Sequence, residues 1–131
     1  SKTDEKHLVQ FGAHRDPLFD YSGFLSGSDF HPRIVDKENN EQQLEMSLEM
    51  KNYRPEEIKV SVKNDELIVK GEHRHNDATH FERSFFFKSI KLPPGTQIEQ
   101  IQSFLTEDGQ LKIQAPFVAI QQQQQPQDAV K

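Results

Sequence analysis

The stretch from Leu105 to Leu111, Leu-Thr-Glu-Asp-Gly-Gln-Leu, predicts an acidic turn that joins two short strands. Ile98 to Leu105 is the predicted strand before the turn, and Gln110 to Gln114 is the predicted strand after it. Gly109 suits the turn because glycine adopts the positive φ that a tight connection often needs. The apolar stretch from Phe117 to Ile120 follows shortly afterwards. This part of the chain therefore predicts a β-hairpin followed by an apolar tail.

Two segments further upstream show a regular alternation of apolar and polar residues. Every second residue is apolar from Leu44 to Met50, and again from Ile58 to Val62. Because successive side chains of a strand point to opposite faces, each segment is predicted to be a half-buried antiparallel strand. Pro55 separates the two, since proline cannot donate a hydrogen bond to a strand ladder. After a turn at Asn64-Asp65, Leu67 to Gly71 is predicted to be a third strand.

The segment from His80 to Leu92 is predicted to be a longer strand that follows a polar loop from His73 to Thr79. The strand ends at Pro93-Pro94-Gly95. Three adjacent phenylalanines, Phe85 to Phe87, place apolar surface on both of its faces. Two interpretations stay open: both faces are covered within one domain, or a second subunit covers the outer face.

The strand pattern and the composition together predict one all-β sandwich domain with loosely packed ends. Short strands separated by turns, without an amphipathic helix between them, are typical of this fold class. The chain has 131 residues, of which 33% are hydrophobic and 28% are charged, a low apolar share for a globular domain. We expect a flexible N-terminal arm at residues 1–42, the domain at residues 43–116, and a tail with a glutamine-rich end at residues 117–131.

Charge and residue types argue against several classes of protein. The net charge of −5 at pH 7 disfavours binding along a nucleic-acid backbone, which needs clustered Lys and Arg. The absence of cysteine suits a reducing compartment, so a cytoplasmic location is expected. No apolar run approaches the roughly 18 residues of a membrane span, and Ser1 to Gln10 lacks the apolar core of a secretory signal. The sequence also lacks phosphate-binding loops and catalytic motifs, so we expect neither enzymatic activity nor a cofactor.

From Leu44 to Pro116 the sequence resembles the α-crystallin domain of small heat-shock proteins of the metazoan type. Four motifs in order carry the resemblance, namely Tyr53 to Val60, Glu66 to His73, Lys91 to Gly95, and Leu105 to Leu111. The resemblance implies an immunoglobulin-like antiparallel β-sandwich. It also implies a chaperone that holds partly unfolded client proteins without ATP and assembles through dimers into homo-oligomers. The alternative from another class is a p23-like interaction module with one dedicated partner.

The resemblance also implies two surfaces for self-association. In metazoan members the long strand pairs with its twin across a two-fold axis, which here involves Phe81, Arg83, Phe85, Phe86, Phe87 and Lys88. Family members often carry arginine where this sequence has Lys88, and lysine cannot make the same bidentate contact with a carboxylate. Domains of this family also have a groove that accepts an apolar tail from a neighbour. Period-two spacing assigns the groove walls to Ile58, Val60 and Val62 on one side and to Ile101, Ser103 and Leu105 on the other.

The tail motif of this sequence is Val118-Ala119-Ile120, whose two branched residues, Val118 and Ile120, point the same way when the chain is extended. Only four residues separate Ile113 from Val118, a connection that reaches at most about 17 Å at about 3.4 Å per residue. The family usually has a longer hinge. Two interpretations stay open: the motif docks on a neighbouring subunit, or Phe117 to Ile120 extends the last strand or packs on its own domain.

Aromatic residues of the arm and three histidines complete the candidate functional residues. An arm with too little apolar mass to fold alone can adapt to irregular surfaces, so we expect client or inter-subunit contacts at Phe11, Phe19, Phe24 and Phe30. The chemistry of His73, His75 and His80 suits a metal ion, but no pattern indicates a fourth ligand, and no metal is expected. We expect instead that these histidines gain charge as the pH falls toward about 6 and thereby weaken assembly.

Overall fold

The computed structural model describes residues 8–14 and 29–120, which form nine strands and three short 3-10 turns. The strands are β1 (Leu8–Phe11), β2 (Ala13–His14), β3 (Asp29–Asp36), β4 (Gln42–Glu49), β5 (Ile58–Lys63), β6 (Glu66–Asn76), β7 (Phe81–Lys91), β8 (Gln102–Leu105) and β9 (Gln110–Phe117). The turns are η1 (Glu38–Asn40), η2 (Pro55–Glu57) and η3 (Ile98–Gln100). Within the described ranges, no helix has the length and the apolar character needed to cross a membrane.

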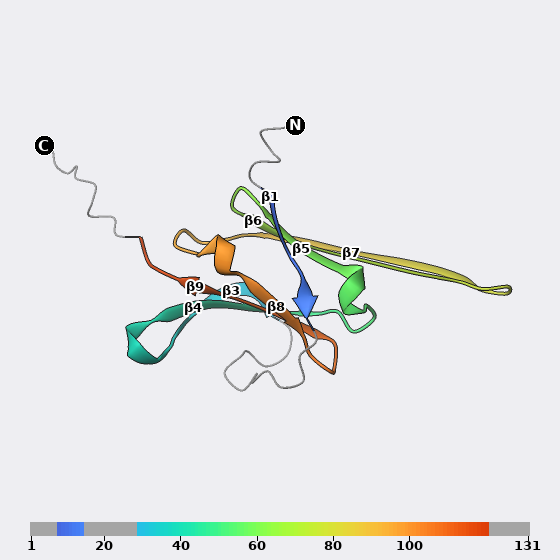
Figure 1. Ribbon diagram of the computed structural model, residues 1–131, viewed down its shortest axis with the longest axis horizontal. Coiled ribbons are helices and arrows are strands. Elements are labelled where there is room, and N and C mark those ends of the chain that lie inside the picture. Colours follow the sequence, from blue (N-terminus) through green and yellow to red (C-terminus); the bar gives the residue numbers. More distant parts are fainter. Residues whose placement is uncertain (1–7, 15–28, 121–131) are drawn as a thin grey trace, which may run out of the picture.

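The strands are arranged in two layers, and the long hairpin of β6 and β7 extends beyond them (Figure 1). One sheet has the strand order β1-β5-β6-β7, and the other has the order β2-β8-β9-β4-β3. Neighbouring strands are antiparallel, except that β2 runs parallel to β8. Hairpin connections place β5, β6 and β7 side by side, as expected for sequential strands with short turns. The predicted all-β antiparallel sandwich is confirmed.

The hydrophobic core lies between the two sheets and is built from the alternating segments of the sequence. Leu44 and Met46 of β4 and Val60 of β5 are 0% exposed, and Leu111 and Ile113 of β9 are equally buried. Because side chains of a strand alternate between its faces, each of these segments delivers one apolar row to the same interior. The core is therefore made of rows that the sequence pattern predicts.

β4 differs from its prediction as a half-buried strand, because both of its faces are covered. Glu45 and Ser47, on the face opposite the core row, are 0% exposed. β4 lies between β9 and β3, so neighbouring side chains enclose its outer face. Glu45 Oε2 lies 3.2 Å from Lys37 Nζ and accepts a hydrogen bond from Gln43 Nε2 at 2.8 Å, while Lys112 Nζ donates to Ser47 Oγ at 3.0 Å. Polar residues are thus buried here with partners, except that Glu45 Oε1 is buried without a hydrogen bond.

β6 is longer than predicted and includes the first part of the segment expected to be a loop. The register with β7 continues without interruption from Glu66 opposite Lys91 to Asn76 opposite Phe81. His73 to Asn76 therefore belong to a strand, and the loop prediction is wrong for them. Ladder hydrogen bonds join backbone groups, so a polar run without an apolar stripe can still pair.

The boundaries of the last two strands also differ from prediction. Ile98–Gln100 forms the turn η3, so β8 begins only at Gln102. β9 runs past the predicted end at Gln114 and continues to Phe117. Its added residues pair with the first residues of β4, Phe117 with Gln42 among them, which accounts for the extension.

β1, β2 and β3 lie in the described parts of the first 42 residues, where the sequence showed no sustained strand pattern. β3 pairs with β4, but its register shifts between Asp29 and Arg33. Pro32 lies at this irregularity, and proline is tolerated at the edge of a sheet, where β3 is found. The irregularity hides the strand in the sequence, so the predicted start of the sheet at Leu44 is too late.

Candidate functional site

β7 is the outermost strand of its sheet and carries exposed aromatic side chains. Among the described strands, its neighbour is β6 alone. Phe81, Phe85 and Phe87 are 64%, 64% and 61% exposed. Phe86 points the other way and packs against the core, with its ring centroid 6.3 Å from that of Tyr53. One aromatic face is thus left open, and the interpretation in which both faces are covered within one domain is wrong.

All six residues predicted to pair across a two-fold axis lie on β7. Phe86 and Lys88 lie on the face opposite that of Phe81, Phe85 and Phe87, because Lys88 is opposite the core residue Val69 in the register, and Phe86 packs against the core. The guanidinium carbon of Arg83 lies 4.5 Å from the centroid of the Phe85 ring, a cation–π geometry, and Arg83 Nη2 lies 3.6 Å from Glu72 Oε2. Lys88 is exposed. The edge strand therefore places exposed phenylalanine rings beside the Arg83 cation, with Lys88 on its other face, along a backbone edge that can accept a further strand.

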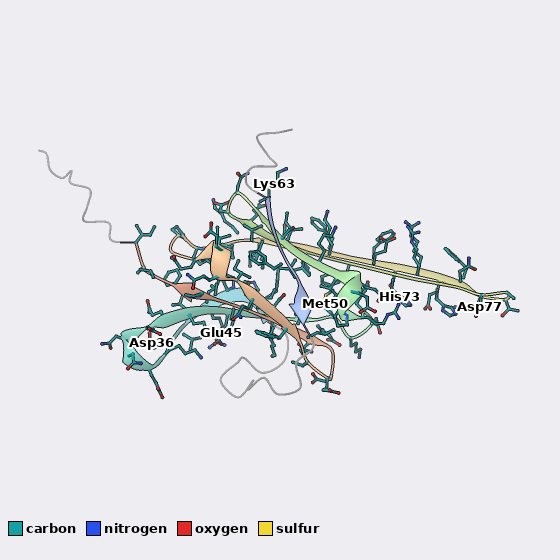
Figure 2. All side chains as sticks on the ribbon, in the orientation of Figure 1. Asp36, Glu45, Met50, Lys63, His73 and Asp77 are labelled. Atoms are coloured by element: carbon teal, nitrogen blue, oxygen red, sulfur yellow. The ribbon has the colours of Figure 1, made fainter. Side chains whose placement is uncertain are left out.

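The three candidate histidines each face a carboxylate of their own subunit. Carboxylate oxygens lie at 2.9 Å from His73 (Glu57), at 3.0 Å from His75 (Asp77) and at 3.8 Å from His80 (Glu82). Figure 2 places Asp77 at the tip of the long hairpin and His73 nearer the sandwich. Protonation of a histidine would strengthen such a contact, so these contacts give no reason for weaker assembly. The expected pH response stays a prediction.

The histidines do not converge on a common centre. His73 lies against Glu57, whereas the rings of His75 and His80 lie 5.8 Å apart near the hairpin tip. In the described part of the chain, no group of three or more potential ligands is placed to hold a metal ion.

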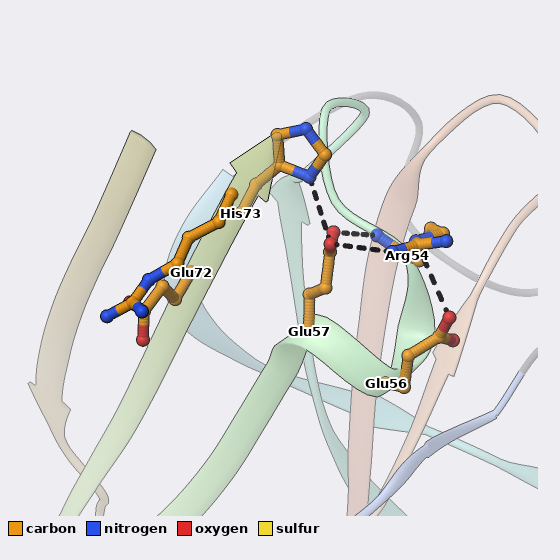
Figure 3. Close-up of polar contacts among 6 residues, drawn as sticks. Arg54, Glu56, Glu57, Glu72 and His73 are labelled. Atoms are coloured by element: carbon orange, nitrogen blue, oxygen red, sulfur yellow. Dashed lines mark hydrogen bonds and ion pairs between the residues drawn. The ribbon is translucent and has the colours of Figure 1, made fainter. Parts of the chain in front are cut away.

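Glu57 connects the η2 turn to β6 (Figure 3). The backbone N–H of Arg54 donates to its Oε1 at 2.9 Å, and its Oε2 lies 2.9 Å from His73 Nδ1 and 3.2 Å from Arg54 Nη2. Partial burial by itself raises the pKa of Glu57. The hydrogen bonds from the Arg54 backbone and from the His73 and Arg54 side chains favour the ionised form more strongly, so its pKa lies below the ordinary value of 4.5.

Replacing Glu57 by glutamine is expected to lower the free energy of unfolding by about 1 kcal/mol at pH 7, because a neutral amide oxygen accepts these bonds more weakly than a carboxylate. The pKa of Glu57 is lower in the folded chain than in the unfolded chain. The carboxylate therefore stabilises the fold above pH 4.5, and this contribution disappears as the pH falls through the lowered pKa. Urea unfolding of wild type and of Glu57→Gln, at neutral pH and near pH 3, measures the difference in their free energies of unfolding at each pH.

Glu56→Gln is the matched control for this substitution. The Glu56 side chain is 67% exposed, and its ion pair with Arg54 Nε is 3.5 Å long. Its loss is expected to change stability by less than about 0.5 kcal/mol. If wild type and Glu57→Gln differ in free energy of unfolding as much in acid as at neutral pH, the carboxylate charge is not what stabilises the turn.

The six predicted groove residues are brought together, but the groove is covered rather than open. Their exposed fractions run from 0% to 6% for Ile58, Val60, Val62, Ile101, Ser103 and Leu105. Residues 8–14 lie along the edge: β1 pairs with β5, and β2 pairs with β8. Ser103 Oγ also donates to the carbonyl oxygen of Gly12 at 2.6 Å. Within one subunit, a segment of the same chain therefore fills this position.

Residues 8–14 escape prediction from the sequence because their pattern is very short. Leu8, Val9 and Phe11 surround one polar residue, Gln10, and Gly12 interrupts the run. Such a segment becomes a strand only when an existing sheet edge offers backbone partners. The apolar residues at the start of the arm were the one available signal.

The tail motif lies away from the core, and its side chains are open to solvent. Val118 and Ile120 are 62% and 55% exposed. The interpretation in which the tail extends the last strand holds as far as Phe117. Beyond it, the Val118 N–H donates to the Gly95 carbonyl at 2.9 Å, which fixes the chain direction without burying the motif.

The arm phenylalanines fall into two groups. Phe11 and Phe30 are half-buried and pack against the core. A role for them as client contacts needs exposed rings, so it stays a prediction that requires their release. Phe19 and Phe24 lie outside the described residues.

Comparison with known proteins agrees with this two-sheet architecture. A family model described as the Hsp20/alpha crystallin family matches residues 36–130. The chain belongs to that family. The resemblance inferred from the four sequence motifs is confirmed, and it extends beyond the stretch that carried them.

Relatives of this member of the Hsp20/alpha crystallin family include heat shock proteins of animals. Heat shock protein hsp-16.2 of Caenorhabditis elegans is 30% identical over 78 residues, which cover 60% of this chain and 54% of that protein. Heat shock protein beta-1 of Gallus gallus is 30% identical over 73 residues, which cover 55% of this chain and 38% of that protein. The chain therefore spans about half the length, or less, of these curated relatives.

A solved structure shows the same fold. The rat alpha crystallin domain matches with a TM-score of 0.54 at 28% identity, covering 76% of this chain and 95% of that one. The match covers most of the described sandwich. The immunoglobulin-like α-crystallin fold implied by the motifs is thus confirmed.

Proposed function

We propose that the protein is an ATP-independent chaperone that binds partly unfolded proteins and prevents their aggregation. The observation that supports this best is the row of three phenylalanines on β7, each more than 60% exposed. A soluble domain rarely leaves such a patch uncovered unless it binds another protein. Burial of one ring contributes roughly 1.5 to 3 kcal/mol, which suits reversible contact with the irregular apolar surface of an unfolding client. Membership of the Hsp20/alpha crystallin family supports the same role.

Self-association is proposed to use the two surfaces described above. β7 pairs with β7 of a second copy, which satisfies the exposed backbone edge and covers part of the phenylalanine row. The Val118 and Ile120 side chains of one subunit then dock along β5 and β8 of a neighbour, which links dimers into a homo-oligomer. Neither contact is expected to be permanent. Each buries only a few apolar side chains, and the entropy lost on ordering the chain offsets part of the free energy that they contribute.

The proposed division of labour starts from the expected parts of the chain. The expected division of the chain into an arm (residues 1–42), a domain (residues 43–116) and a tail (residues 117–131) is adjusted, because β1, β2 and β3 belong to the sheets and β9 ends at Phe117. We propose that the sandwich mediates assembly and that Phe19 and Phe24, from the rest of the first 42 residues, contact clients. The cysteine-free sequence supports a reducing compartment, and we place the protein in the cytoplasm. Proteins of this family are in general not enzymes, and no catalytic role is proposed.

Light scattering by heated client proteins tests the function. Several unrelated clients are heated without ATP, each with an equimolar amount of the purified chain, and suppression of scattering by more than about half is expected for most of them. Serum albumin in place of the chain controls for crowding. Failure with every client, together with a monomeric mass in solution, would favour a p23-like module with one dedicated partner instead.

A further inference from the structure

Residues 8–14 bridge the two sheets at the edge where the groove residues lie. β1 pairs with β5 from Leu8 opposite Lys63 to Phe11 opposite Val60. After Gly12, the chain continues as β2, which pairs with β8 at Ala13 opposite Ser103. One short segment thus contacts the edges of both sheets.

Two contacts hold the segment in place. The half-buried Phe11 side chain packs against the core cluster. The Ser103 hydroxyl, on a residue that is 0% exposed, donates to the Gly12 carbonyl at 2.6 Å. A buried hydroxyl without a partner is unfavourable, so this position favours an occupant that presents a backbone carbonyl. The groove is therefore built to receive an extended chain, and not only apolar side chains.

The tail motif has the same chemical character as the segment that fills the groove. Phe11-Gly12-Ala13 and Val118-Ala119-Ile120 both have a small residue between two apolar ones, and neither contains a charge. The tail of the same subunit is fixed elsewhere, through the bridge between Phe117 and Thr96 and the Val118 hydrogen bond to Gly95. In Figure 1, residues 118–120, which directly follow β9, lie at the left end of the sandwich, away from β1. A competing tail therefore comes from a second copy of the chain.

We propose that residues 8–14 are the resident occupant of this groove and compete for it with the Phe117–Ile120 tail of a second copy. Release of the segment is then the step that opens a subunit to tail-mediated assembly. The identity of the competitor rests on the proposed assembly function, whereas the occupancy by residues 8–14 does not. Tail docking and the exposure of Phe11 are then linked, because the tail can enter the groove only when residues 8–14 leave it.

A disulfide lock tests the inference, because the chain contains no cysteine of its own. Gln10 and Ser61 are opposite in the register of β1 and β5. Antiparallel partners have Cα atoms about 4.5 to 5.5 Å apart, within the range that a disulfide spans. The variant with Gln10→Cys and Ser61→Cys should therefore form a disulfide under mild oxidation. The control has Lys59→Cys and Lys70→Cys, opposite residues of β5 and β6 in the same sheet.

The probe is a synthetic peptide with the sequence of residues 116–121, titrated against the full chain. It is expected to bind the oxidised lock at least about tenfold more weakly than the reduced form of the same variant, with no change in the control pair. Phe11→Ala removes the ring that holds residues 8–14 against the core. This variant is expected to bind the peptide about tenfold more tightly than wild type does. Circular dichroism confirms that each variant is folded.

The possible results separate the parts of the inference. If the disulfide does not form, residues 8–14 are not seated on β5, and the proposal is overturned. If it forms and peptide affinity is unchanged, or if no form binds the peptide, the competition is overturned. The scattering assay reports independently on the chaperone function: lost client protection with an intact lock effect would remove that function and leave the competition standing.

Discussion

Gly109→Ala is expected to lower the free energy of unfolding by roughly 3 kcal/mol or more. Gly109 has a φ of +87°, a region that costs an L-residue roughly 1 to 2 kcal/mol. A Cβ at this position would also lie 2.4 Å from both Cα and Cβ of Lys51, so backbone must move to admit it. Such overpacking typically costs a further 1 to 3 kcal/mol or so. Both costs come from the added Cβ, which meets its own backbone in one case and Lys51 in the other, so a loss of roughly 3 kcal/mol or more is expected when both apply.

The position matters because the turn is tied to the core. The Met50 N–H donates to the Gly109 carbonyl at 2.7 Å, and the Gly109 N–H donates to the Thr106 carbonyl at 3.0 Å. Met50 is only 1% exposed, so displacement of Lys51 is transmitted to a buried side chain. The hairpin of β8 and β9, which supplies one wall of the groove, would lose its register with β4.

Urea unfolding monitored by circular dichroism measures the effect, with Gly71→Ala as the matched control. A Cβ at Gly71 would meet the Met50 Cε atom and the Tyr53 ring, at 3.1 Å, and these side-chain atoms can shift. The control is expected to change stability by less than about 1 kcal/mol in either direction. Equal losses in the two variants would mean that the turn conformation is not the source of the effect.

Sequence pattern predicts those parts of this fold in which side-chain burial decides the structure. The sequence predicts the apolar rows of β4 and β5 and the turns at Asn64 and Gly109. Alternating apolar residues and residues suited to a positive φ can both be recognised within a few neighbouring positions. β1, β2 and the second half of β6 are not visible, since they form by backbone pairing with strands that are distant in sequence or polar. Backbone hydrogen bonds place little constraint on residue type, so they leave little trace in a sequence.

The same distinction explains which parts of the candidate site could be predicted. The phenylalanines of β7 stand out because three adjacent aromatic residues cannot all face one interior. The groove is implied by the family resemblance, and period-two spacing then assigns residues to its walls. The cover over the groove could not be predicted, because whether Leu8–Phe11 meets β5 depends on which edge is free after the sandwich closes. Exposure of an edge is a property of the whole fold.

Combining Phe85→Glu with Phe87→Glu is expected to weaken self-association at least about 100-fold while leaving the subunit folded. Both rings are more than 60% exposed, so the core loses little. At a β7 pairing, the variant loses two apolar anchors worth roughly 1.5 to 3 kcal/mol each and gains carboxylates that must be desolvated. A loss of about 2.7 kcal/mol already corresponds to 100-fold in the dissociation constant. Both positions are changed because Arg83, 4.5 Å from the Phe85 ring, could neutralise a single carboxylate there.

Sedimentation equilibrium over a dilution series measures the dissociation constant, and Ile34→Glu is the matched control. Ile34 is 40% exposed on β3, an edge strand of the other sheet, so the same kind of change is made away from β7. A folded double variant that associates as tightly as wild type would place the contact elsewhere and leave the phenylalanine row without its proposed partner. If the double variant is monomeric and also fails to protect heated clients, subunits and clients use the same rings. Protection that persists in the monomer would assign client binding to another surface, with the arm as the next candidate.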